Sequence, residues 1–358
     1  MDTLGINSTR KALRYALESD TPIHIIGPPG VGKSAIIAGI AKEMKMPLEI
    51  LILSLCDPTD IGGFPVARDG ALDRLPLGAI KKACETPVLL FLDELSCASP
   101  AVQAAALQLI YGRRAGDAVL HPGTRIVAAS NPPDQAAGGW ELALPLIGRM
   151  TQLKMKPTHK EVQEFFYNLG EENSSIRSLA VDWAATLEAD AGLLHIDPPA
   201  GAQQSGRPWG APRSWERGLR LAATATDHKE SDTGEIFGAA LSGNVGEEAA
   251  AAYMAIRKIR HNLPKVQEIL EKPKEARLPN DSSTGCACLG IIAQVAMQDP
   301  CAAWIYAERL TKEVRVAATR VLGRKEFGLQ KHKNSKMYAE ADTAQTKLLR
   351  SVGDAMRQ

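Results

Sequence analysis

The feature that most constrains the fold is a glycine-rich octapeptide at residues 27–34. It reads Gly-Pro-Pro-Gly-Val-Gly-Lys-Ser and fits the pattern G-x-x-x-x-G-K-S/T. A β-prone run, residues 22–26, precedes it, and a helix-prone segment rich in alanine and isoleucine, residues 35–44, follows it. Glycines let successive backbone N–H groups turn toward a phosphate, and the following helix N-terminus adds positive potential. The pattern therefore predicts a phosphate-binding loop, and an ordinary strand-to-helix turn is the alternative.

Each position of this loop is expected to contact a nucleotide. Lys33 would reach the β- and γ-phosphates, and the Ser34 hydroxyl would take one coordination position of Mg²⁺. The predicted nucleotide-binding residues are Gly27, Pro28, Pro29, Gly30, Val31, Gly32, Lys33, Ser34 and Ala35.

A second run, residues 88–94, reads Val-Leu-Leu-Phe-Leu-Asp-Glu. A short, continuous apolar run is typical of a strand buried on both faces of a parallel sheet. Its two carboxylates would emerge at the carboxyl end of the strand, where open α/β sheets bind ligands. We expect Asp93 to belong to the Mg²⁺ shell and Glu94 to polarise the attacking water. An exposed acidic turn after a core strand is the alternative.

Another apolar run, residues 124–130, predicts a further buried strand that ends at Asn131. A polar amide beside the carboxylate strand could orient a hydrolytic water. An asparagine before proline is otherwise an ordinary turn residue.

The pattern changes to helices from about residue 158. A loop rich in proline, glycine and glutamine, residues 197–210, interrupts them, and Arg213 follows at the start of a helix. A cation is slightly unfavourable at a helix N-terminus, which favours an anionic partner, and a solvated helix residue is the alternative. Farther on, residues 271–283 resemble a charged linker, and one helix is predicted over 301–322.

Composition excludes few functions. Of 358 residues, 45% are hydrophobic, and the formal net charge of +1 gives no general argument for nucleic-acid or membrane binding. No apolar run reaches the length of a membrane span. The six cysteines lack paired C-x-x-C spacing, so we expect reduced thiols and a cytoplasmic protein.

Together these segments resemble the AAA+ ATPases, most closely the MoxR-like branch of the dynein-related, helix-2-insert group. The resemblance covers residues 1 to about 262. It implies that residues 27–34 are Walker A, residues 88–94 Walker B, Asn131 sensor 1, Arg149 an arginine finger and Arg213 sensor 2. The residues around Arg149, Gly148 and Met150, depart from the usual pattern of the branch, so Arg114 remains the rival finger.

The resemblance also implies a domain plan. It is an α/β P-loop core with a parallel sheet at residues 1–155, an insert at about 57–76 with a hairpin around Asp69-Gly70, and an α-helical lid at 156–262. Residues 263–358 lie outside the resemblance, and we expect them to form an additional α-helical region without an assigned role.

The favoured function is therefore Mg-ATP hydrolysis by a homo-oligomeric ring, expected to be a hexamer, that remodels or activates a protein client. Proteins of this branch often work with a partner carrying a von Willebrand factor A domain.

A nucleic-acid motor or loader is the alternative. The neutral charge opposes it. Residues 324–358, with eight Lys and Arg against four Asp and Glu, are the one feature in its favour, and a solvated terminal helix is the favoured interpretation of them. A nucleotide-gated scaffold with little turnover is the third hypothesis, and Lys33, Asp93 and Glu94 argue against it.

Overall fold

The computed structural model describes residues 3–136, 139–170, 174–260 and 262–355. These residues form two compact units. The first comprises residues 1–158 and 196–203, and the second comprises 159–195 and 204–358. Most of the expected lid and the whole C-terminal region thus fall within the second unit, whereas residues 156–158 and 196–203 of the expected lid belong to the first. The three-part division itself stays a prediction.

The first unit contains a parallel five-stranded sheet in the described part of the chain. Its order is β2-β5-β8-β1-β9, and each neighbouring pair is parallel. The strands are β1 (Ile23–Ile26), β2 (Leu48–Ile52), β5 (Leu89–Asp93), β8 (Arg125–Ser130) and β9 (Thr151–Lys154). The order places β5, β8 and β1 side by side, so that the segments following their carboxyl ends are neighbours.

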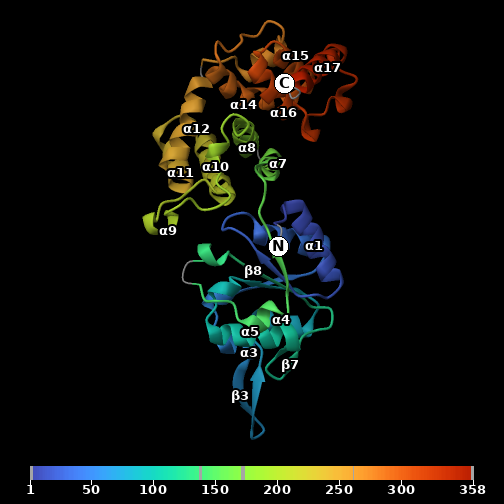
Figure 1. Ribbon diagram of the computed structural model, residues 1–358, viewed down its shortest axis with the longest axis vertical. Helices are drawn as coiled ribbons and strands as arrows, with labels where there is room; N and C mark the ends of the chain where they lie inside the picture. Colours follow the sequence, from blue (N-terminus) through green and yellow to red (C-terminus); the bar gives the residue numbers. More distant parts are fainter. Residues whose placement is uncertain (1–2, 137–138, 171–173, 261, 356–358) are drawn as a thin grey trace. The chain divides into compact units, whose positions relative to one another are not determined.

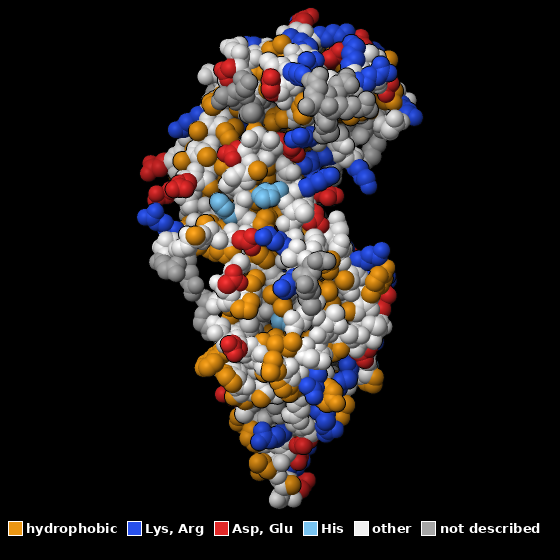
Figure 2. All heavy atoms as spheres, in the orientation of Figure 1, with side chains coloured by type: hydrophobic (Ala, Val, Ile, Leu, Met, Phe, Trp, Pro, Cys, Tyr) orange, Lys and Arg blue, Asp and Glu red, His pale blue; other side chains and the backbone are white. Residues whose placement is uncertain are grey.

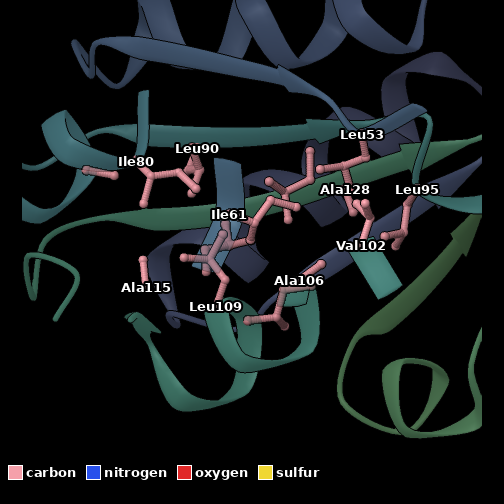
Figure 3. Packing of buried hydrophobic residues seen from close by; sticks show 14 of the residues in the cluster. Leu53, Ile61, Ile80, Leu90, Leu95, Val102, Ala106, Leu109, Ala115 and Ala128 are labelled. Atoms are coloured by element: carbon pink, nitrogen blue, oxygen red, sulfur yellow. The ribbon is translucent and has the colours of Figure 1, made fainter. Parts of the chain in front are cut away.

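Helices cover this sheet. They are α1 (Ile6–Glu18), α2 (Lys33–Glu43), α3 (Pro58–Gly62), α4 (Gly78–Glu85), α5 (Pro100–Gly112) and α6 (Leu144–Ile147). One core cluster joins α3, α4 and α5 to β5 and β8, through Ile61, Ile80, Leu109, Leu90 and Ala128 (Figure 3). Alternate residues of β5 are buried on both sides of the sheet, as the apolar run predicts.

Two hairpins lie in the same unit. The longer consists of β3 (Phe64–Arg68) and β4 (Ala71–Leu75), and it extends away from the sheet (Figure 1). Its turn has positive φ angles at Asp69 and Gly70, the signature of the predicted Asp-Gly turn. The shorter hairpin consists of β6 (Arg114–Ala115) and β7 (Ala118–Val119).

The second unit is helical. Its helices are α7 (His159–Asn168), α8 (Ser174–Thr186), α10 (Pro212–Asp227), α11 (Glu235–Val245), α12 (Glu247–Arg260), α13 (Val266–Glu271), α14 (Ser282–Gln298), α15 (Pro300–Glu308), α16 (Lys312–Leu322) and α17 (Tyr338–Ala355). The short α9 (Ala202–Ser205) lies where the chain returns from the first unit. The α/β fold class with an α-helical C-terminal region is confirmed.

One predicted element was wrong, and the bounds of another differ by one or two residues. Residues 301–322 form two helices, because Thr311 adopts an extended backbone before α16, and both Leu310 and Val314 are buried around this break. The charged segment 271–283 includes the end of α13 and the start of α14. Asp281 caps α14 by accepting a 2.8 Å hydrogen bond from the Thr284 N–H.

A buried ionic cluster joins helices of the second unit. Asp182 of α8 accepts hydrogen bonds from the Tyr253 hydroxyl (2.6 Å) and the Arg257 guanidinium (2.8 Å), both on α12, and it also pairs with Arg260. Asp182 is fully buried. A buried carboxylate needs such partners, so the cluster ties α8 to α12.

Candidate active site

The phosphate-binding loop lies between β1 and α2 in the first unit. Gly30 and Gly32 have φ angles of 80° and 97°, which side chains rarely adopt. At Gly27 the reason for glycine is space, since a Cβ there would lie 2.7 Å from the Met155 carbonyl oxygen. The Gly27 N–H donates a 3.2 Å hydrogen bond to the Ser130 carbonyl at the end of β8. The loop is thereby fixed to its two neighbouring strands.

Lys33 begins α2, and its side chain is buried. Its ammonium group donates to the carbonyl oxygens of Gly27 (2.7 Å) and Pro28 (2.9 Å) and to the Oδ1 of Asn131 (2.8 Å). The structure thus brings together the lysine of the loop and the amide that follows β8. Both groups belong to one polar cluster at the carboxyl ends of adjacent strands.

The two carboxylates lie at the carboxyl end of β5, at the same edge of the sheet, where Asp93 is the last residue of the strand and Glu94 follows it. The Ser34 hydroxyl donates a 3.3 Å hydrogen bond to the Oδ2 of Asp93, and the Glu94 N–H donates a 2.9 Å bond to its Oδ1. A hydroxyl and a carboxylate are hard oxygen ligands of the kind that Mg²⁺ binds together with phosphate oxygens and water. Among the described residues there is no group of three or more His, Cys, Asp or Glu side chains placed to hold a metal. The donor set therefore fits a nucleotide-bound Mg²⁺ better than a protein-only metal site.

Glu94 is exposed and has a φ angle of 58°, a strained conformation for glutamate. Its carboxylate accepts a hydrogen bond from the hydroxyl of Ser54, which follows β2. Sequence reasoning missed Ser54. Only the structure, which ends β2 at Ile52, puts Ser54 beyond the carboxyl end of a strand, close to Glu94 after β5.

Arg149 lies at the opposite edge of the sheet from this cluster. It precedes β9, whose first residue, Thr151, pairs with Ile23 at the start of β1. The phosphate-binding loop follows the other end of β1. Arg149 is exposed. Because it precedes β9 while the loop follows β1, the structure does not bring it to the loop of its own unit.

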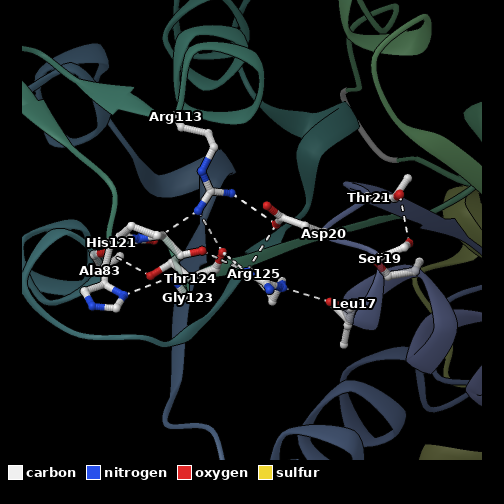
Figure 4. Close-up of polar contacts among 12 residues, drawn as sticks. Leu17, Ser19, Asp20, Thr21, Ala83, Arg113, His121, Gly123, Thr124 and Arg125 are labelled. Carbon is white, nitrogen blue, oxygen red and sulfur yellow. Dashed lines mark hydrogen bonds and ion pairs between the residues drawn. The ribbon is translucent and has the colours of Figure 1, made fainter.

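The two neighbouring arginines at the end of α5 differ in their contacts. Arg113 pairs with Asp20 (3.3 Å) and donates to the carbonyl oxygens of His121 and Thr124, which ties α5 to the start of β8 (Figure 4). Arg114 is exposed and donates a 2.9 Å hydrogen bond to the carbonyl of Asp117 in its own hairpin. Arg113 is thus held by the fold, and Arg114 remains the rival of Arg149.

Arg213 belongs to the second unit, at the first turn of α10. Pro212 precedes it there, and its side chain is exposed while Trp215 of the same turn is fully buried. The buried tryptophan donates a 2.6 Å hydrogen bond from its indole to the Leu193 carbonyl. This contact fixes the helix end that carries Arg213.

Other features of the described chain bear on its partners. No helix has the combination of length and apolar character that a membrane crossing requires. Figure 2 shows Lys, Arg, Asp and Glu side chains interspersed with hydrophobic ones over the visible face.

One family model matches part of the chain. Residues 22–150 match the model of the AAA domain of the dynein-related subfamily. No curated protein matches the sequence. One similar solved structure is a variant of RuvB, the Holliday junction branch migration motor of Thermotoga maritima, at 17% identity over 76% of this chain and 77% of that chain, with a TM-score of 0.43. Another is NtrX from Brucella abortus in complex with ADP, at 16% identity over 91% of this chain and 67% of that chain, with a TM-score of 0.43.

At these levels of similarity neither solved structure indicates a function for this chain. The family match covers the phosphate-binding loop, both carboxylates, Asn131 and Arg149. The family match therefore assigns residues 22–150 to an AAA domain of the dynein-related subfamily.

Proposed function

We propose that this protein is a Mg-ATP-hydrolysing ring motor of the MoxR type that remodels or activates a partner protein. The observation that carries the proposal is the polar cluster at the ends of β1, β5 and β8. Lys33 contacts Asn131 there, and Ser34 contacts Asp93, with Glu94 adjacent.

Each group has a role in this proposal. Lys33, freed from the loop carbonyls, binds the β- and γ-phosphates, and the loop residues 27–35 surround them with N–H groups. Ser34 and Asp93 would hold Mg²⁺, which would offset negative charge on the phosphates. Glu94 accepts a proton from the attacking water or polarises it, and Asn131 orients that water. Arg213 would act in cis, on the nucleotide that is bound to the same chain.

Arg149 would act on the nucleotide of a neighbouring copy. Its place at the far edge of the sheet from its own loop supports this role, because an arginine that stabilises the transferring phosphoryl group must reach the phosphates. Subunits arranged in a ring, expected to be a hexamer, meet that requirement at every interface. Arg114 is the alternative donor.

The protein client would contact the two hairpins. Phe64 and Leu72 of the longer hairpin and Val119 of the shorter one are large apolar side chains that are at least half exposed. Exposed apolar side chains gathered on projecting hairpins suit transient binding of a polypeptide. A partner with a von Willebrand factor A domain and a cytoplasmic location belong to this proposal.

Two substitutions test the chemistry. Lys33→Ala should abolish nucleotide binding, because the loop loses its cation. Glu94→Gln should bind ATP with unchanged affinity and hydrolyse it about a hundredfold more slowly or worse, since a base-like group is lost. Fluorescent-nucleotide binding and steady-state phosphate release measure the two effects.

The Glu94→Gln protein also serves as a trap for the client, identified by mass spectrometry of what co-purifies in ATP but not with Lys33→Ala. Wild-type turnover by Glu94→Gln would contradict the assignment of Glu94. Salt-dependent stimulation of the ATPase by DNA, without any protein captured, would favour the nucleic-acid motor instead.

A further inference from the structure

Tyr111 contacts Arg149, the arginine that, in the proposed function, acts on the nucleotide of a neighbouring copy. The Arg149 guanidinium carbon lies 4.5 Å from the centroid of the Tyr111 ring. The Nη1 of the same guanidinium donates a 3.0 Å hydrogen bond to the Pro145 carbonyl. The arginine is therefore held between an aromatic face and a backbone acceptor, although it is exposed.

The two contacts come from elements that pack together. Tyr111 belongs to the last turn of α5, and Arg149 follows α6 after one residue. Leu146 of α6 is fully buried in the core cluster that contains Leu109 and Ile110 of α5. This buried leucine fixes α6 on α5, so the backbone positions that carry the ring and the arginine are held close to each other.

The exposure of Tyr111 argues against a role in the core. Its side chain is 70% exposed, one of the most exposed large apolar side chains described in this unit. A surface tyrosine that contributes little to the core but covers a guanidinium is suited to orient that guanidinium. A cation over an aromatic face is stabilised by about twofold to fivefold in population at an exposed site.

We propose that Tyr111 is a positioning residue that holds Arg149 in the orientation presented to the nucleotide of the adjacent subunit. This inference rests on the proposed function, specifically on Arg149 acting between copies. An arginine side chain otherwise samples many rotamers, and orienting it beforehand lowers the entropy lost when it meets the phosphate. Tyr111 touches neither nucleotide nor phosphate in this scheme, and it acts only through Arg149.

The test mixes full-length chains that carry complementary defects. Arg149→Ala keeps an intact phosphate-binding loop, and Lys33→Ala keeps an intact Arg149. Each chain alone should be inactive. In the mixture, a Lys33→Ala subunit supplies Arg149 to the loop of an Arg149→Ala subunit, so ATPase activity should recover. This is the reference mixture.

Tyr111→Leu is then added to one chain at a time. On the Lys33→Ala chain, which donates the arginine, it should lower the recovered kcat by about twofold to fivefold. On the Arg149→Ala chain it should change nothing, because that chain has no guanidinium to orient. The KM for ATP should stay constant in both mixtures, since the nucleotide contacts belong to the accepting loop.

Two controls separate this effect from folding. Tyr111→Phe on the donating chain keeps the ring and should keep the recovered kcat. Tyr15→Leu removes another exposed tyrosine of the same unit, on α1, with Lys11 5.8 Å from its ring centroid, and should not alter the activity on either chain. Thermal unfolding of each variant verifies that the chains are equally folded.

The outcomes distinguish the two proposals. Suppose that the reference mixture recovers activity, and that Tyr111→Leu lowers the recovered kcat equally on either chain or raises it. Either result would overturn the positioning role of Tyr111 and leave the proposed motor intact. A reference mixture without recovery would overturn the role of Arg149 and that of Tyr111 together. Recovery from Arg114→Ala mixed with Lys33→Ala would then assign the donor to Arg114.

Discussion

At the residue scale, a buried histidine lies directly beneath the phosphate-binding loop. The Nε2 of His24, in the middle of β1, lies 2.7 Å from the hydroxyl oxygen of Ser130. Ser130 precedes Asn131, and its carbonyl accepts the hydrogen bond from Gly27. The His24 side chain is almost fully buried, and burial lowers its pKa to about 4. The neutral imidazole of His24 therefore helps to hold β1, which leads into the loop, against the end of β8, which leads into Asn131.

This depressed pKa predicts a loss of stability in mild acid. The unfolded chain binds a proton at His24 near pH 6.5, whereas the folded chain does so only near pH 4. Stability contributed by the neutral form is present above about pH 6.5 and is lost as the pH falls toward 4. Between pH 7 and pH 5 the free energy of unfolding should fall by about 2 kcal/mol from this group. Urea unfolding at both pH values measures it.

His24→Gln is the control, because glutamine keeps polarity without titrating in this range. Its free energy of unfolding should depend less on pH than that of the wild type by about the same 2 kcal/mol. Equal pH dependence in the two proteins would mean that His24 is not the group responsible.

At the element scale, the two hairpins of the first unit are joined by two hydrogen bonds between Asp117 and the Arg74 backbone. The Oδ2 of Asp117 accepts a 2.6 Å hydrogen bond from the Arg74 N–H, and the Asp117 N–H donates to the Arg74 carbonyl at 3.3 Å. Gly116 has a φ angle of 59°, and a Cβ there would lie 2.7 Å from the carbonyl oxygens of Arg74 and Gly62. The turn of the shorter hairpin therefore docks against the longer one.

Gly116→Ala should separate them. The substitution combines an unfavourable φ with a clash against backbone, so it should cost about 1–3 kcal/mol and speed amide hydrogen exchange in residues 64–75. Gly70→Ala is the matched control, since Gly70 has a φ angle of 80° with open space around its Cβ direction. It should cost less and leave exchange at residues 114–119 unchanged. Identical effects from both substitutions would mean that φ strain alone, and not docking, explains Gly116.

At the scale of the whole molecule, the proposed chemistry is divided between copies. The loop, Asp93 and Asn131 follow the carboxyl ends of the strands, whereas Arg149 precedes β9 at the other edge. No rearrangement of side chains alone can bring Arg149 to its own loop, because the length of the sheet separates them. A second copy can, and its position would be repeated around a closed ring.

Assembly should therefore depend on ATP. The Glu94→Gln protein in ATP is expected to form a ring with the mass of a hexamer, because bound nucleotide is kept at each interface. Multi-angle light scattering at micromolar concentration measures the mass, and Lys33→Ala, which lacks nucleotide, is the control that should remain smaller. A strictly monomeric Glu94→Gln protein in ATP would contradict the ring.

Local chemistry was sufficient to predict the elements of the site. The glycines at 30 and 32 are required by backbone geometry that other residues disfavour, and the run at 88–94 is apolar throughout because its strand is buried on both faces. A strand, a loop and a helix in direct succession place Lys33 and Ser34 with little help from the rest of the chain. Such features depend on neighbours in sequence, so the sequence itself predicts them.

Contacts between distant segments depended on the tertiary structure. Ser54 meets Glu94, Gly116 meets Arg74, and Tyr111 meets Arg149, each pair separated by about 40 residues. Their side chains carry no periodic signal, since a serine, a glycine and an exposed tyrosine are compatible with many surroundings. The order of the strands and the packing of α6 on α5 bring these pairs together. Burial of Leu146 and its neighbours drives that packing, because removing apolar surface from water is favourable whatever polar contacts it creates at the surface.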